Sequence, residues 1–400
     1  MSVGLLTSAS APANLNALSF AQMITRLMPN GTAPLFGLTA LLKDETASNI
    51  EHGYYSKTVV FPSVTLGAAV ADGVATTLTV VSTADIVVGD MLMVSSTQEI
   101  MLVTAVTNAT TLAVQRGVGT IAAAAVSNSV VLYTVGNAFE EGSVRPAASS
   151  ILPVRNVNNT QIFRNSWAVT KTAAAIPQIA GAGYVGESKS DCAMFHAQAI
   201  EKALFFSQKY MGTRNGMPFH TMEGIIPRVT AAAPGNIVTL GSTTNWTQFE
   251  AALDPTLQTV TDPKSGNTRT MFVGGTARRV IHNIARMNST YQITGDKTEW
   301  GLQIDTIRTP RGVFEMIEHP LFNAYGASSA WAKMAVVCDL NAFSLAYLRR
   351  TDDAGYNASG ALVDNGVDAE GGTLTTELTC LIKNPSAFGV LYNFTAAAAG

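Results

Sequence analysis

The sequence predicts an α+β protein, because strand-like and helix-like patterns occupy different stretches of its 400 residues. Short runs rich in Val, Thr and Ala fill residues 59–139, with turn residues between them. A single long helical pattern covers residues 188–212, and two strong strand patterns close the chain. A chain of this length is expected to fold as two or three compact units.

The composition predicts a protein whose surface is covered by partners. Charged residues make up only 13% of the chain, and hydrophobic residues make up 47%. Soluble domains typically carry about 25% charged residues. With so few ionic groups to solvate a surface, the chain is expected to bury apolar area against other subunits. The net charge of −3 does not indicate a nucleic-acid-binding protein, although local basic residues can still contact DNA nonspecifically.

The cysteines and the N-terminus bear on where the protein is made. Cys192, Cys338 and Cys380 are far apart and odd in number, which predicts reduced core thiols and no disulfide or zinc framework. No apolar run approaches the ~18 residues of a membrane helix. No charge precedes Arg26, so no signal peptide is predicted. We expect a protein that is made in a cytoplasm and stays soluble or assembles.

The first 20 residues are small and polar, as in an extended arm. Residues 19–29 predict a short amphipathic helix that Pro29 ends, and residues 34–42 form a second short apolar segment. The apolar face of the predicted helix contains Phe20, Met23, Ile24 and Leu27.

Residues 59–139 predict a small β domain, or a long β excursion inserted between more mixed segments. No lysine occurs between Lys57 and Lys171. Turn residues such as Asp72-Gly73 separate the runs. The strands are expected within Ala75–Val81, Met91–Val94, Ile100–Val106, Thr111–Val114 and Ser129–Val135.

Two opposite charges, Glu99 and Arg116, lie in the middle of this apolar stretch. We expect both to be exposed and to contribute little to stability. The alternative is an ion pair between subunits that fixes their register.

The long helix is expected to begin near Ser188, where Asp191 completes an S-x-x-D capping pattern, and to end at Gly212. One face is apolar, but Phe195 and Phe205 intrude on the polar face. A helix that needs cover on more than one side lies between layers or between subunits. His196 is expected to be a packed core histidine.

The rest of the chain mixes helices and strands. A polar, Gly-rich loop is expected at residues 350–372. Helices are expected around Trp246–Leu253, ended by Pro255, and at Ala277–Met287. Strands are expected at Gln161–Val169, Met271–Val273, Val313–Ile317, Met334–Cys338, Leu374–Ile382 and Ala387–Phe394.

One glycine motif raises the possibility of a nucleotide site. Residues 181–186 match G-x-G-x-x-G and precede the long helix, as in a nicotinamide-dependent enzyme. The context argues against that interpretation, because Pro177 interrupts the preceding run and no second strand with an acidic end follows. A glycine hinge is the favoured interpretation, and the enzyme remains an alternative.

No other pattern carries chemistry. The five histidines have no metal-ligand spacing. Gly274-Gly275 before Arg278-Arg279 reads as a strand-to-helix turn, with an anion site as the alternative. Asp352 and Asp353, beside two arginines, are expected in a solvated loop. We therefore predict no enzyme, and no catalytic, cofactor-binding or metal-binding residues.

Three patches resemble tailed-bacteriophage major capsid proteins of the Hong Kong 97 fold. Residues 158–164 (NNTQIFR) resemble the segment that leads out of the extended loop in such proteins. Residues 187–211 resemble the spine helix of the peripheral domain. Residues 377–394 (ELTCLIKNPSAFGVLYNF) resemble the closing strand pair of that domain.

The resemblance implies a division of the chain. Residues 1–58 would be the N-terminal arm, and 59–145 the extended loop with an inserted small β domain. Residues 146–215, with the spine helix 188–212, and residues 373–400 would build the peripheral domain. Residues 216–372 would be the axial domain.

The resemblance also implies a structural role in the virion capsid shell. Subunits made in the bacterial host cytoplasm would assemble with themselves as hexamers and pentamers of an icosahedral head. Portal, scaffolding and decoration or cement proteins would be partners, and double-stranded DNA would be enclosed nonspecifically, with no membrane. Some relatives cross-link through a lysine in the extended loop; this region has none, so noncovalent contacts are expected. A β-rich surface-binding module using residues 59–139 is a further alternative, and it would require export.

Overall fold

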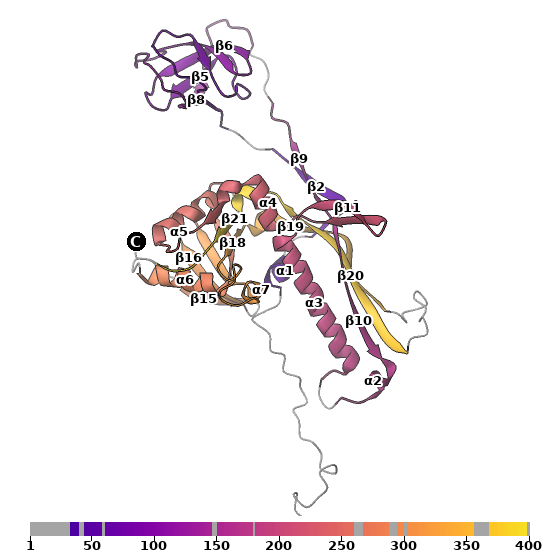
Figure 1. Ribbon diagram of the computed structural model, residues 1–400. Coiled ribbons are helices and arrows are strands. Elements are labelled where there is room, and N and C mark those ends of the chain that lie inside the picture. The colour runs from indigo at the N-terminus through magenta and orange to yellow at the C-terminus, as the bar shows by residue number, and fades with distance from the viewer. Residues whose placement is uncertain are drawn as a thin grey trace, which may run out of the picture. The chain divides into compact units, whose positions relative to one another are not determined.

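The computed structural model describes residues 33–39, 44–57, 61–145, 150–178, 181–259, 267–287, 294–299, 302–355 and 368–397. The expected arm of residues 1–20 and the expected helix at 19–29 lie outside these ranges. The chain divides into two compact units, one of residues 55–154 and a larger one that contains residues on both sides of it (Figure 1). Helices and strands occupy separate segments, so the predicted α+β class is confirmed.

A four-stranded sheet and a long helix form one part of the larger unit. The strands lie in the order β1 (Glu45–Thr46), β19 (Phe343–Gly355), β20 (Ala369–Ile382) and β10 (Gln161–Thr170). β10 and β20 pair in an uninterrupted antiparallel register from Gln161 opposite Leu378 to Thr170 opposite Ala369. Helix α3 (Tyr184–Phe206) lies along both strands, as Figure 1 shows, with short helix α2 (Lys171–Ala175) between β10 and α3.

The predicted bounds of the long helix, 188–212, are wrong at both ends. Gly183, at φ 87°, is the N-cap, and a residue other than glycine rarely adopts that backbone conformation. After Phe206 the chain becomes extended and forms a hairpin of β11 (Tyr210–Arg214) and β12 (Met217–Thr221). Asn215 and Gly216 both have positive φ, as a two-residue hairpin turn requires. Gly212 therefore lies inside a strand and does not end the helix.

The expected loop at 350–372 is also shorter than predicted. β19 continues to Gly355, and β20 begins at Ala369. Asp353 pairs with Leu374 in the ladder, so the aspartates at 352 and 353 are strand residues. Cross-strand pairing with an already long β20 outweighs the turn-like composition of this segment.

A seven-stranded sheet forms the other part of the larger unit. Its order is β13 (Ile237–Thr239), β21 (Gly389–Tyr392), β18 (Ala335–Cys338), β14 (Thr268–Val273), β17 (Val313–Glu318), β16 (Leu302–Arg308) and β15 (Thr294–Glu299). The associated helices are α4 (Ile225–Ala232), α5 (Trp246–Leu253), α6 (Gly275–Met287) and α7 (Pro320–Asn323).

Alternating residues of the central strands divide between two cores. On β14, Met271 and Val273 belong to one buried cluster, and Phe272 belongs to the other. On β18, Val337 and Val336 divide in the same way. Because successive side chains of a strand point to opposite faces, this continuous apolar pattern marks a sheet that is covered on both sides.

The last two strands do not form the expected closing pair. β20 belongs to the four-stranded sheet, whereas β21 pairs with β13 and β18 in the seven-stranded sheet. A 3₁₀ turn at Pro385–Ala387 redirects the chain between them. Proline fixes φ and cannot donate to a ladder, so the strand stops before it and a new one begins in another sheet.

The smaller unit contains a six-stranded sheet around its own core. The order is β3 (Ser63–Thr65), β8 (Val131–Asn137), β5 (Asp90–Val94), β6 (Ile100–Asn108), β7 (Thr111–Gln115) and β4 (Thr77–Thr79). Each of the five runs predicted as strands overlaps one of these strands. Leu78, Leu92, Met101, Leu112 and Leu132 are fully buried in a cluster that no residue of the larger unit joins.

Both expectations for Glu99 and Arg116 are wrong, because the two form a buried ion pair within the smaller unit. Arg116 Nε and Nη2 donate to the two carboxylate oxygens at 2.6 Å, and the side chains are 4% and 0% exposed for Arg116 and Glu99. The backbone N–H groups of Gly117 and Ala124 also donate to Glu99. Arg116 in turn donates to the carbonyl oxygens of Asp72 and Ala124.

Burial raises the pKa of Glu99, but the hydrogen bonds from Arg116, Ala124 and Gly117 outweigh it and hold the pKa below its usual value. The carboxylate therefore stays ionised at neutral pH and keeps every loop that it contacts in place. When one partner of a buried, fully hydrogen-bonded ion pair is removed, the fold is strongly destabilised, because the other charge remains buried without its partner.

We predict that Glu99→Ala lowers the free energy of unfolding of residues 55–154 by about 3–5 kcal/mol. Hydrogen exchange of the amides in β5 and β6 measures that loss in the full-length chain. The exposed carboxylate of Asp85 provides the control, since Asp85→Ala should change stability by about 0.5 kcal/mol or less. Equal protection in the two variants would contradict the role of the pair.

His196 is a buried core histidine, as expected. It is 4% exposed, and its Nδ1 lies 2.9 Å from Asn165 Oδ1 while its Nε2 lies 2.7 Å from Thr376 Oγ1. The amide oxygen only accepts, so Nδ1 carries the proton and Nε2 accepts from the threonine. Burial lowers the pKa of His196, because the charged imidazolium would lose solvation.

A base with a folded pKa below its unfolded pKa contributes stability above the unfolded pKa of about 6.5, and loses it as the pH falls below that value. We therefore predict lower stability at pH 5.5 than at pH 7.5. His196→Gln should reduce this pH dependence in chemical denaturation, and the control His52→Gln should retain it. An unchanged pH profile in His196→Gln would assign the effect to other groups.

Candidate functional site

The five histidines do not converge on one place in the larger unit. His282 Nε2 lies 3.0 Å from Asp305 Oδ2, and His52 Nε2 lies 3.4 Å from Glu45 Oε2. His319 bonds Glu201, and His220 bonds the carbonyl oxygen of Thr160. Within the described ranges, no group of three or more potential ligands could hold a metal ion.

The glycine motif at 181–186 lacks the setting of a nucleotide site. Helix α2, and not a strand, precedes it in the described sequence at 171–178, and Gly186 lies inside α3. Gly183 serves as the N-cap of α3. The structure therefore agrees with the hinge interpretation and gives no support to a pyrophosphate turn.

Gly274 is needed for close packing at the turn before α6. A Cβ on Gly274 would lie 2.4 Å from the carbonyl oxygen of Ala332, so only glycine fits between the two backbones. Arg278 binds Asp305 at 2.6 Å and Glu318 at 2.9 Å. Burial lowers the pKa of Arg278, but these carboxylates outweigh it and raise the pKa overall. The Arg278 guanidinium is committed to neighbours in its own chain and is not available to an anion, whereas Arg279 is exposed.

Of the two aspartates near Arg349 and Arg350, Asp353 has side-chain partners and Asp352 lies in the β19–β20 ladder. Asp353 accepts from Trp167 Nε1 at 3.2 Å and lies 3.6 Å from Lys189 Nζ. Arg349 binds Glu377 at 2.8 Å. The predicted solvated loop is thus an ordered strand with cross-strand pairs.

The three cysteines are free and buried, in agreement with the predicted thiols. Burial, followed by the nearby charge of Glu223, raises the pKa of Cys380 to about 12, so this thiol stays protonated and unreactive. Among the helices that the structure describes, none combines the length and apolar character that a bilayer crossing requires.

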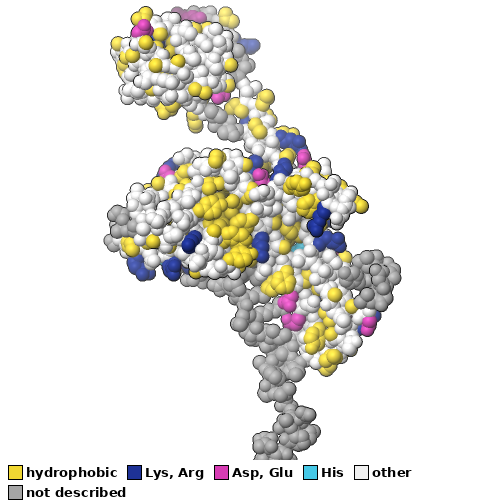
Figure 2. All heavy atoms as spheres, viewed as in Figure 1, with side chains coloured by type: hydrophobic (Ala, Val, Ile, Leu, Met, Phe, Trp, Pro, Cys, Tyr) yellow, Lys and Arg dark blue, Asp and Glu magenta, His cyan; other side chains and the backbone are white. Residues whose placement is uncertain are grey.

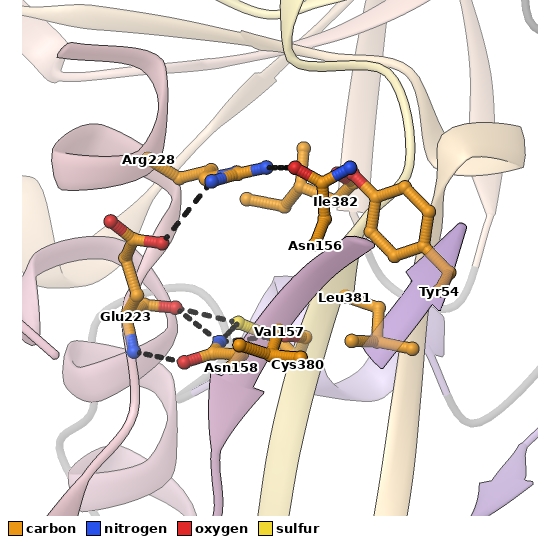
Figure 3. A pocket seen from close by; sticks show the side chains of 9 residues that line it. All are labelled: Tyr54, Asn156, Val157, Asn158, Glu223, Arg228, Cys380, Leu381 and Ile382. Carbon is orange, nitrogen blue, oxygen red and sulfur yellow. Dashed lines mark hydrogen bonds and ion pairs between the residues drawn. The ribbon is translucent and has the colours of Figure 1, made fainter. Parts of the chain in front are cut away.

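One hollow lies where β2 (Glu51–Ser56) and β9 (Val154–Asn159) meet the larger unit's core, and Figure 3 shows the side chains around it. Asn158 Nδ2 donates to the carbonyl oxygens of Glu223 and Cys380, and its Oδ1 accepts from the N–H of Glu223 at 2.7 Å. Arg228 donates to Asn156 Oδ1 at 2.8 Å. Tyr54 Oη donates to the carbonyl oxygen of Ile382.

This hollow is too small for a substrate. It leaves about 10 Å³, whereas small-molecule sites occupy roughly 300–1,000 Å³. Its polar groups point at one another across β2, β9, α4 and β20 (Figure 3). The cluster therefore anchors the β2–β9 ribbon. Along β2 the chain leaves the larger unit, and along β9 it returns from residues 55–154.

A buried carboxylate on α3 holds the start of the described chain. Glu201 is fully buried, and its two oxygens accept from the backbone N–H groups of Leu35 and Phe36 at 2.8 and 2.7 Å. His319 Nε2 donates to the same carboxylate at 2.7 Å. Leu35 and Phe36 open helix α1 (Pro34–Thr39), whose first N–H groups have no partner inside the helix. Glu201 caps α1 from a position 165 residues away in sequence.

Further contacts hold the residues after α1. β1 pairs in parallel with β19, and Glu45 accepts from Lys383 at 2.6 Å and from Ser344 at 3.0 Å. Burial raises the pKa of Glu45, but the bonds from Lys383 and Ser344 outweigh it and lower the pKa overall. The sequence analysis missed Glu201 and Glu45. A lone glutamate on the apolar side of a long helix was the available signal for Glu201.

Exposed apolar side chains are concentrated in the smaller unit. Residues 55–154 hold 14 of the 24 exposed large hydrophobic side chains of the described chain. Phe61, Val144 and Val74 are 90%, 89% and 81% exposed. Large apolar groups at this exposure are typical of surfaces that another protein covers.

The larger unit exposes its own apolar surface. The β11–β12 hairpin presents Tyr210, Met211, Met217 and Phe219 to solvent. Figure 2 shows further hydrophobic side chains gathered near the centre of the visible face of this unit. A two-stranded ribbon without cover is marginally stable in water, so the hairpin is suited to packing against a partner.

Buried ionic anchors, committed polar groups and exposed apolar surfaces are together typical of a structural subunit that binds other proteins. Comparison with known proteins gives the same class and a family. Residues 7–395 match the SU10 major capsid protein family, and the chain belongs to it. The major capsid protein of Pseudomonas phage PaMx41 is 38% identical over 403 residues, which cover 97% of this chain and 95% of that protein.

Solved structures show weaker likenesses. A chain from Mycobacterium phage Cain gives a TM-score of 0.49 at 8% identity, covering 99% of this chain and 100% of that chain. A chain from the capsid of a native GTA particle also gives a TM-score of 0.49 at 8% identity, covering 98% of each. The family assignment rests on the two sequence matches.

We predict that Glu201→Ala releases α1. The change leaves two backbone N–H groups and His319 Nε2 buried without an acceptor, at about 1–3 kcal/mol for each group. Amide exchange at Leu35 and Phe36 should accelerate by at least about tenfold. The exposed neighbour Lys202 provides the control, and Lys202→Ala should leave the exchange unchanged. Protection that survives in Glu201→Ala would mean that other contacts hold α1.

Proposed function

We propose that the chain is the major capsid subunit of a tailed-phage head and that it assembles into the hexamers and pentamers of an icosahedral shell. The observation that carries this proposal is the sequence match over residues 7–395 to a family of major capsid proteins. The subunit would be made in the bacterial host cytoplasm and would reside in the virion shell. Its role would be structural and not enzymatic.

The surface chemistry supports self-association. A chain with 13% charged residues has few groups to solvate exposed apolar area, and both compact units expose such area. Permanent interfaces bury about 2,000–5,000 Å² and are more hydrophobic than transient ones. Copies of the chain would supply the cover that the isolated subunit lacks.

The proposed fold is of the Hong Kong 97 type. In support, a long helix lies beside long antiparallel strands, and a second sheet covered on both faces follows in the chain. The β unit at 55–154 would replace the range 59–145 expected for the enlarged extended loop, and the N-terminal arm, expected at 1–58, would then end at residue 54. The closing segment after Pro385 would belong with the axial domain, because β21 lies in the seven-stranded sheet.

Noncovalent contacts would hold the shell. The segment between Lys57 and Lys171 contains no lysine for an isopeptide bond in the extended loop. Portal, scaffolding and decoration or cement proteins would be partners, and double-stranded DNA would be contacted nonspecifically. These partner proposals rest on family membership. A nicotinamide-dependent enzyme gains no support from the glycine motif, and a surface-binding role for the β unit would require export.

Electron microscopy of the purified chain tests the proposal, and we predict shells, tubes or capsomers. A variant lacking residues 65–135 should keep the larger unit folded, because the deletion falls within the smaller unit and its ends lie on paired strands β3 and β8. That variant should form no shells or deformed ones, since it lacks the folded β unit and half of that unit's exposed large hydrophobic side chains.

Circular dichroism and thermal unfolding of the deletion variant provide the control for folding. Full-length protein that stays monomeric under every condition would refute the capsid role. Normal shells from the deletion variant would show that the β unit is not required for assembly of the shell.

A further inference from the structure

The β11–β12 hairpin is held to the larger unit near its base and leaves its tip exposed. Near the base, the imidazole of His220 bonds the carbonyl oxygen of Thr160. At the tip, every residue from 213 to 218 is exposed, and Figure 1 shows the hairpin projecting from the rest of the larger unit. Solvent therefore reaches both residues of the turn, Asn215 and Gly216.

Asparagine followed by glycine is the dipeptide most prone to spontaneous loss of the side-chain amide. The main-chain nitrogen after an asparagine can attack the side-chain amide carbon, and glycine has no Cβ to shield that nitrogen. Apart from its chain neighbours, no described atom lies within 4 Å of the place that a Cβ on Gly216 would occupy. Neither the Asn215 amide nor the Gly216 N–H forms a hydrogen bond with another residue that the structure describes. Both reacting groups are therefore free.

The turn can bring these two groups together without opening the hairpin. Asn215 has φ 52° and Gly216 has φ 75°, and positive values at both central residues are those of a type I′ turn. Rotation of the single peptide plane between them gives a type II′ turn, in which the first residue keeps a positive φ and the second takes a negative one. Glycine adopts either sign readily, so the strands stay paired while the Gly216 nitrogen turns toward the Asn215 side chain.

We propose that Asn215 deamidates spontaneously in the folded chain and that the isoaspartate formed there opens the tip of the hairpin. Hydroxide removes the proton of the Gly216 N–H, and the nitrogen attacks Cγ of Asn215. A bond forms between that nitrogen and Cγ, and the bond from Cγ to the amide nitrogen breaks. The amide nitrogen takes a proton from water and leaves as ammonia, and a five-membered succinimide remains.

Hydrolysis of the succinimide determines the product. Water that adds at Cγ reopens the ring to aspartate in the original main chain. Water that adds at the main-chain carbonyl carbon gives isoaspartate, whose main chain runs through Cγ and is one methylene longer. The register that sets Arg214 opposite Met217 requires a turn of two ordinary residues, so isoaspartate disturbs it and aspartate does not. The reaction consumes only water and does not depend on the proposed role in a shell.

Peptide mapping of the full-length chain after incubation in mildly alkaline buffer tests the site. Digestion with pepsin at acid pH adds no deamidation, and mass spectrometry separates this peptide from those of Asn30 and Asn365, which also precede glycine. The internal reference is Asn137, which is exposed but precedes Ala138. We expect Asn215 to convert at least about tenfold faster than Asn137, a difference of about 1.4 kcal/mol in the barrier. The rate should rise in proportion to the hydroxide concentration.

Conversion no faster than at Asn137 would overturn the proposal. Conversion of Asn215 that requires urea would also overturn it, because the closed turn would then protect the amide. Asn215→Gly is the matched control, since Gly-Gly forms the same kind of turn and has no amide to lose. The mass of its hairpin peptide should stay constant during the incubation.

Hydrogen exchange separates the effect of the new charge from that of the longer main chain. Fresh Asn215→Asp carries the charge in an ordinary main chain, so its β11 and β12 amides should exchange as in the wild type. Aged wild-type protein should contain a population whose β11 and β12 amides exchange at least about tenfold faster, because a two-stranded ribbon is marginally stable once its turn is disturbed. The share of that population should match the isoaspartate content measured with an isoaspartyl methyltransferase. Uniform exchange in aged protein that contains isoaspartate would overturn the opening of the tip.

Discussion

The carboxylate of Glu201 is the interaction on which the arrangement of the larger unit depends. It joins three segments that are far apart in sequence, namely α1, the C-terminal part of α3 and the residue that precedes α7. A buried carboxyl group is costly unless it is hydrogen-bonded, and here three donors bond to it. Loss of any one donor would leave a carboxylate oxygen with one hydrogen bond fewer in a buried setting, so this group links the stability of the three segments.

Phe205 and His319 show how packing supports this anchor. The ring of Phe205, which is fully buried, meets His319 edge-on at 5.0 Å, and Phe322 stacks on His319 at 4.4 Å. The aromatic rings exclude water from the Glu201–His319 contact, which strengthens the hydrogen bond and raises the cost of breaking it. The anchor and the core that surrounds it therefore depend on each other.

The smaller unit uses the same physical solution independently. Its Glu99–Arg116 pair is buried and fully bonded, and four backbone groups from neighbouring loops complete it. Both units therefore keep a few charged groups buried with bonded partners, and both leave some large apolar side chains exposed. For a soluble monomer that distribution is unfavourable, whereas for a subunit covered by its own copies it removes ionic groups from interfaces and keeps each unit internally ordered.

The sequence by itself determined the α+β class, the five strand runs of 59–139, and the strands at the centre of the seven-stranded sheet, because these depend on local composition and periodicity. It also carried the family resemblance, which the match over residues 7–395 confirmed. It did not determine where α3 ends, because the turn at Asn215-Gly216 and the hairpin it closes override helix propensity at Met211. Nor did it predict that Glu99, Arg116 and Glu201 are buried, since a charged side chain is expected at the surface until its partners are known. Those partners lie up to 166 residues away, and only the tertiary structure brings them within hydrogen-bonding distance.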